Sequence, residues 1–263
     1  YQYIHLATIS SVSLPTDLWV PSSTLVKPQE GEQYAAGIFK NFADNRYEAS
    51  VELYYKHLDN QIEYRDGATP GGDIGDNPDN SFVFGWAESY GAEFFLKKAV
   101  GDLSGWIGYT WSKTNRTFVD INEGLSFPAK YDRRHDLSVI ASYKFSERWS
   151  ASAVFVYATG NAMTLPASRY FIEGNIVNEY VVRNSMRMKP YHRADLSATY
   201  KIKKGRFFDS SLNFSVYNAY NRKNPYFIYF DNEGSIVDGS FTTTAKLVSL
   251  FPALPSVSWN FSF

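Results

Sequence analysis

The chain closes on a run in which apolar and polar side chains strictly alternate. From residue 255 to residue 263 every second position is apolar, and serine or asparagine occupies each position between. Successive side chains of a β-strand point to opposite faces, so this segment has one apolar and one polar face. The apolar positions are Pro255, Val257, Trp259, Phe261 and Phe263. Because the pattern does not fray into polar residues, we expect the apolar face to contact lipid.

The same two-residue period recurs through the chain. In residues 194–202, alanine, leucine, tyrosine and isoleucine alternate with aspartate, serine, threonine and lysine. Residues 136–145 and 149–157 alternate in the same way on either side of a short turn, which predicts a hairpin. Residues 48–56 also alternate, and their charges fall on the polar face. The chain is therefore predicted to be all-β, with antiparallel neighbouring strands.

Short and long connections alternate between the predicted strands. About ten strands are expected, at 1–11, 31–42, 46–58, 83–99, 102–114, 133–145, 148–159, 190–203, 207–230 and 242–263. The tight turns are 43–45, 100–101, 146–147 and 204–206, and the long connections are 12–30, 59–82, 115–132, 160–189 and 231–241. An outer-membrane β-barrel has this asymmetry, with short periplasmic turns and long extracellular loops. We therefore expect extracellular long loops, a periplasmic C-terminus, and strands such as 207–230 that project beyond the membrane.

Composition narrows the class of protein. Hydrophobic residues make up 44% of the 263 residues, yet no stretch approaches the roughly eighteen consecutive apolar residues that a membrane-spanning helix requires. A role in the bilayer must therefore use strands, and only a closed barrel satisfies every backbone N–H and C=O in lipid. A net charge of −1 without a basic stripe argues against a nucleic-acid partner. The lack of cysteine excludes disulfides and cysteine-ligated metals.

Three segments resemble one known family. Residues 127–138 (FPAKYDRRHDLS), 217–222 (YNAYNR) and 254–263 (LPSVSWNFSF) resemble the C-terminal barrel portion of a TonB-dependent outer-membrane receptor of the Bacteroidetes type. The resemblance covers essentially the whole chain. It implies that residues 1–263 form about ten strands of an antiparallel transmembrane barrel of about 22 strands. The N-terminal plug and the earlier strands would lie outside this sequence.

By this resemblance the complete protein is an active transporter of the outer membrane. It would bind a scarce nutrient, such as a siderophore, cobalamin, a glycan or a peptide, and would draw energy from the inner membrane through TonB. The expected partners are membrane lipid, the plug domain, the outer-membrane assembly machinery and a surface lipoprotein. Neither a cofactor nor an enzymatic activity is expected. This chain would supply the lipid-facing seal and part of the ligand-contact surface.

Two other functions fit parts of the pattern. A passive porin would have the same alternating wall without a plug. A secreted β-sandwich that binds a ligand would fill a dry core with one strand face and would have short hairpins at both ends. The alternation of short and long connections argues against the sandwich.

Three groups of residues are candidate functional positions. Phe263, with Phe261 and Trp259, resembles the family's C-terminal signal for the assembly machinery. Arg134 and Asp136, and likewise Arg193 and Asp195, stand two positions apart, so each pair is expected to point into the lumen and to form a charge pair. The loop aromatics Trp19, Tyr131, Tyr170 and Tyr180 are candidate ligand contacts, although ordinary loop packing also explains them.

Two further patterns do not amount to a metal site. Asp66, Asp73, Asp76 and Asp79 lie among glycines, but their spacing does not match a calcium-binding loop, and these residue types are ordinary turn formers. The histidines His5, His57, His135 and His192 lack the spacing of zinc ligands. We therefore predict no metal or catalytic site, and leave calcium binding by residues 66–80 open.

Overall fold

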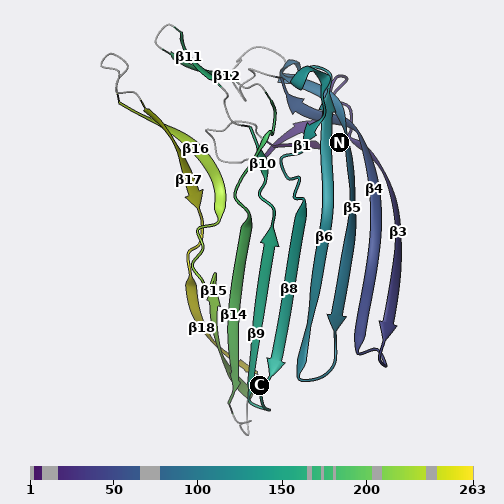
Figure 1. Ribbon diagram of the computed structural model, residues 1–263, viewed down its shortest axis with the longest axis vertical. Coiled ribbons are helices and arrows are strands. Elements are labelled where there is room, and N and C mark those ends of the chain that lie inside the picture. Colours follow the sequence, from purple (N-terminus) through teal and green to yellow (C-terminus); the bar gives the residue numbers. More distant parts are fainter. Residues whose placement is uncertain are drawn as a thin grey trace.

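The computed structural model describes residues 3–7, 17–65, 78–164, 168–172, 175–179, 182–202, 209–234 and 242–262. One antiparallel sheet dominates the described chain (Figure 1). Its neighbouring strands, in spatial order, are β18 (Leu254–Ser262), β15 (Asp209–Tyr217), β14 (Tyr191–Lys201), β9 (Trp149–Ala158), β8 (His135–Lys144), β6 (Leu103–Phe118), β5 (Phe82–Lys98), β4 (Tyr47–Tyr64) and β3 (Glu30–Phe42). The short β7 (Phe127–Pro128) pairs with β6. Within the described residues β3 and β18 form the two edges and do not pair with each other.

Tight turns gather at one end of this sheet, which we call the turn end. The first of them places Ala43, Asp44 and Asn45 at positive φ, and Arg46 N donates to Ala43 O at 3.1 Å. The turn after β8 is closed by Ser146 Oγ, which accepts from the backbone N–H of Trp149 at 3.1 Å. The C-terminal strand also ends on this side of the sheet (Figure 1).

The opposite end, which we call the loop end, carries the long connections. They contain small hairpins outside the main sheet: β1 (Tyr3–Ala7) with β2 (Asp17–Pro21), β10 (Ala162–Met163) with β13 (Met186–Arg187), β11 (Ser168–Ile172) with β12 (Asn175–Glu179), and β16 (Pro225–Glu233) with β17 (Thr242–Ser249). Two short 3₁₀ turns, η1 (Pro78–Ser81) and η2 (Asn122–Gly124), also lie there. Among the described residues, no helix is long and apolar enough to cross a membrane.

The sequence-based boundaries were wrong at both termini. The predicted strand 207–230 is two strands, β15 and β16, because Asn218 and Asn221 between them adopt positive φ. The predicted strand 242–263 is likewise divided into β17 and β18, with Phe251 at positive φ in the break. A residue in this left-handed region departs from the extended backbone, and here the strands end on either side of it. The predicted first strand contributes only β1, which pairs with β2 and not with the main sheet.

Strand register sorts the side chains of the sheet into two faces. One registered row joins Val51, Phe94, Tyr109, Leu137 and Tyr157 across five neighbouring strands. We call the surface that contains this row the apolar face. The intervening positions form the polar face.

The buried hydrophobic core is small and lies at the loop end. Its central cluster consists of Val83, Phe118, Ile121 and Phe127, all at most 2% exposed. These residues come from the loop ends of β5 and β6 and from the connection to β8, so the core anchors the loop end and does not cover the middle of the sheet. The alternative β-sandwich would need such a core along the whole of one face.

Candidate functional site

The candidate functional surface is the wall itself, because its large apolar side chains remain exposed. On the apolar face Ile38 is 77% exposed, Leu196 is 50% exposed and Val257 is 66% exposed. Other exposed members of this face are Val51, Leu53, Phe94, Leu96, Ile107, Phe214 and Trp259. A contiguous apolar surface of this extent is avoided in water and is typical of a membrane or partner contact.

A row of aromatic side chains borders the apolar face at the turn end. Phe42 stacks on Tyr47 with ring centroids 5.2 Å apart, and Trp149 contacts Tyr200 across strands at 4.8 Å. Trp259 contacts Phe261 on β18 at 5.6 Å. Tyrosine and tryptophan combine an apolar ring with a polar tip, so they favour the boundary between lipid and water.

A second aromatic row borders the apolar face at the loop end. There the Tyr109 hydroxyl lies 2.8 Å from His135 Nδ1, and the Tyr220 hydroxyl lies 2.8 Å from His192 Nδ1. Tyr157 stacks against His192 with centroids 6.4 Å apart.

The two aromatic rows are separated by about the thickness of a hydrocarbon core. Trp149 and Tyr157 are eight positions apart on β9, and Tyr200 and His192 are eight positions apart on β14. Eight residues of a strand rise roughly 27 Å, which a tilt of about 40° converts to about 21 Å of membrane depth, close to the roughly 25 Å apolar band of an outer-membrane barrel. The strands therefore have the length and the chemical zoning of membrane-spanning strands.

The polar face carries small hydroxyl and amide side chains, together with larger apolar ones such as Phe39, Phe95 and Trp106. Ser142 and Ser152 hydroxyls lie 2.8 Å apart, and Ser215 and Ser256 hydroxyls lie 2.7 Å apart. Strand register extends this into one row of Ser104, Ser142, Ser152, Ser197, Ser215 and Ser256. This serine row suits water or a polar partner.

One of the two predicted charge pairs is present in the structure and the other is rearranged. Arg193 Nε donates to Asp195 Oδ2 at 3.0 Å, and the Arg193 guanidinium also stacks on the ring of Tyr217 at 4.1 Å. Arg134 does not pair with Asp136; its Nη2 donates to Asp132 Oδ2 at 3.2 Å. Asp136 instead faces Arg133 at 3.9 Å. The expected pairing failed because Arg134 precedes the start of β8, where strand alternation does not apply.

Asp132 is a buried anchor of the loop end that sequence analysis missed. Its carboxylate is fully buried and accepts from Thr114 N at 2.7 Å, from Arg134, and from Arg187 of β13. Arg187 also donates to the backbone carbonyl of Asp132. The carboxylate thus joins β6, the connection to β8 and the connection to β14. Its sequence signal was the motif Asp132-Arg133-Arg134, in which an acid precedes two bases.

A second missed anchor lies where β15 gives way to β16. Asn218 is 1% exposed; its Nδ2 donates to Arg222 O at 2.9 Å and to Phe251 O at 3.1 Å, and its backbone N–H donates to Asp195 Oδ1 at 2.8 Å. Asn224 exchanges hydrogen bonds with the backbone of His192 at 3.0 and 2.9 Å. These asparagines fasten the β16–β17 hairpin to the wall. The clustering of Asn218, Asn221 and Asn224 in sequence was the available signal.

A third anchor joins β4 to β6 at the loop end, on the polar-face side of the sheet. Arg116 Nη1 lies 2.5 Å from Glu63 Oε2, and Nη2 donates to Ile62 O at 2.7 Å. Burial lowers the pKa of the Arg116 guanidinium, an effect that the Glu63 carboxylate opposes.

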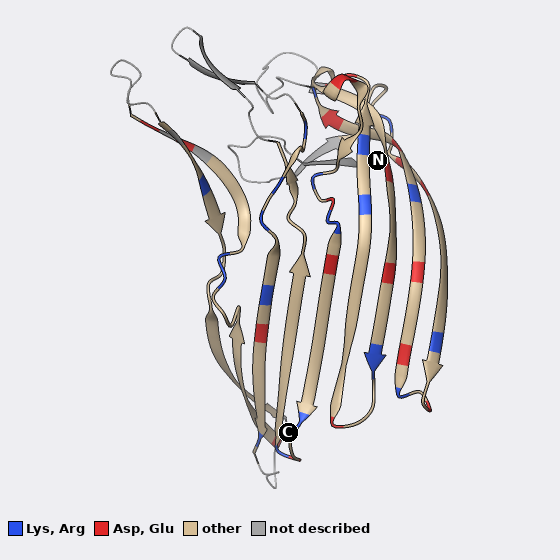
Figure 2. Cartoon of the chain, viewed as in Figure 1, with Lys and Arg blue, Asp and Glu red and all other residues tan. Residues whose placement is uncertain are grey.

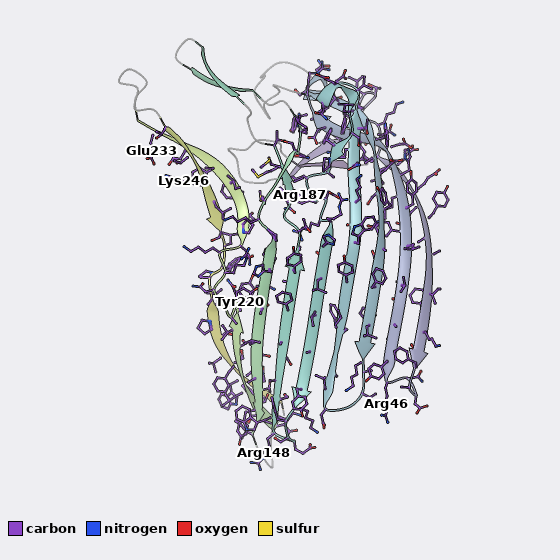
Figure 3. The ribbon with its side chains drawn as sticks, in the orientation of Figure 1. Arg46, Arg148, Arg187, Tyr220, Glu233 and Lys246 are labelled. Carbon is purple, nitrogen blue, oxygen red and sulfur yellow. The ribbon has the colours of Figure 1, made fainter. Side chains whose placement is uncertain are left out.

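The β16–β17 hairpin carries an exposed ion pair. Lys246 contacts Asp231 and lies 3.1 Å from Glu233 (Figure 3). Hydrogen bonds to these carboxylates raise the pKa of the Lys246 ammonium above its ordinary value.

The predicted loop aromatics and the terminal residue are only partly described. Tyr131 is 57% exposed, and Lys130 Nζ lies 5.2 Å from its ring centroid. Trp19 lies in β2 and Tyr170 in β11, where only the backbone is described. Tyr180, Phe263 and most of the aspartate-rich loop fall outside the described residues. Within the part of the chain that is described, no cluster of three or more His, Cys, Asp or Glu could hold a metal.

Comparison with known sequences decides the family. The profile of the TonB-dependent receptor-like β-barrel family matches residues 8–219. The chain belongs to this family. TonB-dependent receptors are receptors and transporters of the outer membrane, not enzymes. No curated protein sequence matches the chain.

Solved structures of TonB-dependent receptors share the fold. The pyoverdine receptor FpvA of Pseudomonas aeruginosa PAO1 aligns with a TM-score of 0.59 at 17% identity, over 99% of this chain and 33% of its own. The ferric-catecholate receptor Fiu of E. coli K12 aligns with a TM-score of 0.52 at 17% identity, over 91% of this chain and 28% of its own. The iron transporter FrpB of Neisseria meningitidis aligns with a TM-score of 0.52 at 14% identity, over 90% of this chain and 32% of its own. This chain thus spans about a third of such a TonB-dependent receptor.

Proposed function

We propose that this chain forms part of the wall of a TonB-dependent importer in the outer membrane. The observation that carries the proposal is the apolar face, which remains exposed across nine neighbouring strands and is bordered by two aromatic rows. Lipid would cover this face, and the polar face would line the lumen. Membership of the receptor family supports the same assignment.

The orientation follows from the two ends of the sheet. The loop end would face the outside of the cell, and the turn end would face the periplasm. In this proposal residues 1–263 are the C-terminal part of the barrel, and the plug and the segment that contacts TonB belong to the rest of the protein. Strands from that part would pair with the edges of β3 and β18 and close the cylinder, since an unpaired edge in lipid leaves backbone groups without partners.

Transport in this arrangement involves no covalent chemistry. TonB would pull on the plug, and cargo would then move along the lumen. The hydroxyl row on the polar face would offer exchangeable hydrogen bonds to water and cargo, while the apolar face would keep the wall sealed in lipid. The Asp132 and Asn218 anchors would hold the loop connections in place at the mouth.

Iron chelates are the first substrate class to test. FpvA, Fiu and FrpB are described as binding pyoverdine, importing ferric catecholate and transporting iron. Cobalamin, glycans and peptides are the remaining candidates, and a surface lipoprotein is a candidate partner. Trp19, Tyr131, Tyr170 and Tyr180 are the proposed loop contacts, because aromatic rings stack on sugars and flat chelates.

Assembly would depend on the end of β18. We propose that Trp259, Phe261 and Phe263 are read by the outer-membrane assembly machinery. Replacing Phe261 and Phe263 by serine should slow the appearance of the folded, heat-modifiable form in cells. Replacing Ser256 and Ser258 by threonine is the matched control and should leave the rate unchanged.

The transport proposal is tested by uptake of radioactive ferric siderophores in cells that express the complete receptor. Uptake should require both an intact TonB and the proton-motive force. Uptake that continues without TonB would instead support the alternative that the protein is a passive porin. If no iron chelate enters, the same assay with cobalamin, glycans and peptides tests the other substrate classes.

A further inference from the structure

All three methionines of the chain lie in one small two-stranded ribbon at the loop end. They are Met163 in β10, Met186 in β13, and Met188, which follows β13. The chain contains no cysteine, so these thioethers are its only sulfur atoms. We call the three side chains the methionine cluster.

The register of the ribbon places the methionine cluster on one face. Met163 pairs directly with Met186. The backbone N–H of Met188 donates to Asn161 O at 3.0 Å, which continues the same antiparallel alignment by two positions. Directly opposite residues, and residues two positions apart on one strand, point to the same side of a ribbon. The three thioether side chains are therefore neighbours.

The other face of the ribbon is fixed to the protein. Ala162 and Arg187, which alternate with the methionines, point to that side. Ala162 is 2% exposed, and the Arg187 guanidinium contacts the buried Asp132 carboxylate (Figure 3). Gly160 allows the two segments to lie close together, because a Cβ at this position would clash with Met188 O. The backbone that carries the methionine cluster is thus held in place.

The methionine side chains themselves are open to solvent. Met186 is 50% exposed, and Met163 and Met188 are partly exposed. Methionine ordinarily fills gaps in a hydrophobic core, where its flexible side chain is enclosed by other apolar groups. This cluster is not enclosed in that way. Grouped thioethers that solvent can reach, on a fixed backbone, are suited to bind a ligand from outside.

The available ligand atoms favour a soft cation. Residues 160–164 and 184–189 contain no Asp, Glu, His or Cys, so the ribbon offers no carboxylate for Ca²⁺ or Mg²⁺ and no imidazole or thiolate for Zn²⁺. Figure 2 shows acidic residues on β4, β5, β8 and β14 of the main sheet, whereas β10 and β13 have none. Thioether sulfur selects Cu(I) among the biological metals.

We propose that the methionine cluster binds Cu(I) through the three thioether sulfurs. Directly opposite residues of an antiparallel pair have Cβ atoms about 5 Å apart, and residues two positions apart on a strand are separated by about 7 Å. Three rotatable bonds in each side chain let the sulfurs converge on one ion. The inference does not rest on the proposed function, because binding requires only the ribbon.

The experiment titrates the purified complete receptor with Ag(I), a soft ion of the same charge that does not change oxidation state, and follows binding by calorimetry. The test variant carries Met163→Leu, Met186→Leu and Met188→Leu, which remove the sulfurs and nearly conserve side-chain volume. The matched control carries Val182→Leu and Ser185→Ala, two exposed neighbours without sulfur. Heat-modifiable gel mobility confirms that each protein is folded.

The wild type and the control should bind one more Ag(I) per receptor than the test variant. Met186→Leu alone, at a half-exposed position, should already weaken this binding and provides the test if the triple variant does not fold. Cu(I) under anaerobic conditions should displace the Ag(I), whereas Zn²⁺ and Ca²⁺ should not. Because a thioether has no proton to lose, the affinity should stay constant between about pH 5 and pH 8, unlike that of a histidine or cysteine site.

Equal Ag(I) binding by the wild type, the test variant and Met186→Leu would overturn the proposal. A failure of Cu(I) to displace Ag(I) from the wild type would overturn it as well. The titration uses purified protein, so a lack of TonB-dependent uptake would count against the importer and would leave this result unaffected.

Discussion

A charge placed at the centre of the apolar face gives the most direct test of the wall. Leu196 lies on β14 midway between two aromatic positions, four residues from His192 and four from Tyr200. Four strand residues rise about 14 Å, which a tilt of about 40° reduces to about 10 Å of membrane depth. The Leu196 side chain, which is 50% exposed, therefore lies close to the bilayer midplane.

Replacing Leu196 by Arg should destabilise the folded barrel by about 2 to 4 kcal/mol, the cost of a cation on the lipid face at the midplane. Ala198→Arg, nearer to Tyr200, should cost less. Ser197→Arg, one residue away on the polar face, is the matched control and should be tolerated. The pair Ala141→Arg and Ser142→Arg repeats the comparison on β8, where the register places Ala141 on the same face as Leu196.

The assay is urea unfolding of the complete receptor in lipid vesicles, with heat-modifiable gel mobility as the measure of folded protein. The reasoning requires the Leu196 and Ala141 variants to lose stability while the Ser197 and Ser142 variants keep it. Equal losses for both sets would show that the two faces are assigned wrongly. A Leu196→Arg protein as stable as the wild type would show that this face does not contact lipid.

Three further predictions concern the loop end. Asp132→Ala should lower the free energy of unfolding by about 3 kcal/mol, because it leaves Arg134 and Arg187 without their buried carboxylate. The same change should increase hydrogen exchange in residues 119–134. Asn218→Ala should cost about 2 kcal/mol through lost hydrogen bonds to buried carbonyls and should expose the β16–β17 hairpin to protease. The raised pKa of Lys246 means that its pair with Asp231 is complete below the ordinary lysine pKa and is lost as pH rises through the higher folded value. Nitrogen NMR of Lys246 should therefore show a pKa above the ordinary lysine value, and an ordinary value would contradict the pairing.

The central strands could be predicted from sequence because a two-residue period needs no knowledge of distant residues. Strands near 31–42, 133–145 and 190–203 were confirmed as β3, β8 and β14. In 133–145 and 190–203, apolar and polar residues alternate, and a strand that meets lipid on one side and water on the other shows this pattern locally. The same alternation assigned Leu196 and Ser197 to opposite faces.

The two-residue alternation mispredicted the strands where hydrogen bonds to distant residues determine the path of the backbone. The segment 207–230 looks continuous in sequence, but Asn218 turns the chain because its side chain bonds to Arg222 and Phe251. The partner of Arg134 was also mistaken, since Asp132 is brought to it by a buried cluster that includes Arg187.

The sequence by itself determined the strand period, the two chemical faces and the alternation of short turns with long loops, because each depends on residues close together in the chain. Only the tertiary structure decided how the loop end is held together. The partners of Asp132 and Asn218 lie as many as 55 residues away, and no local pattern specifies a contact over that separation.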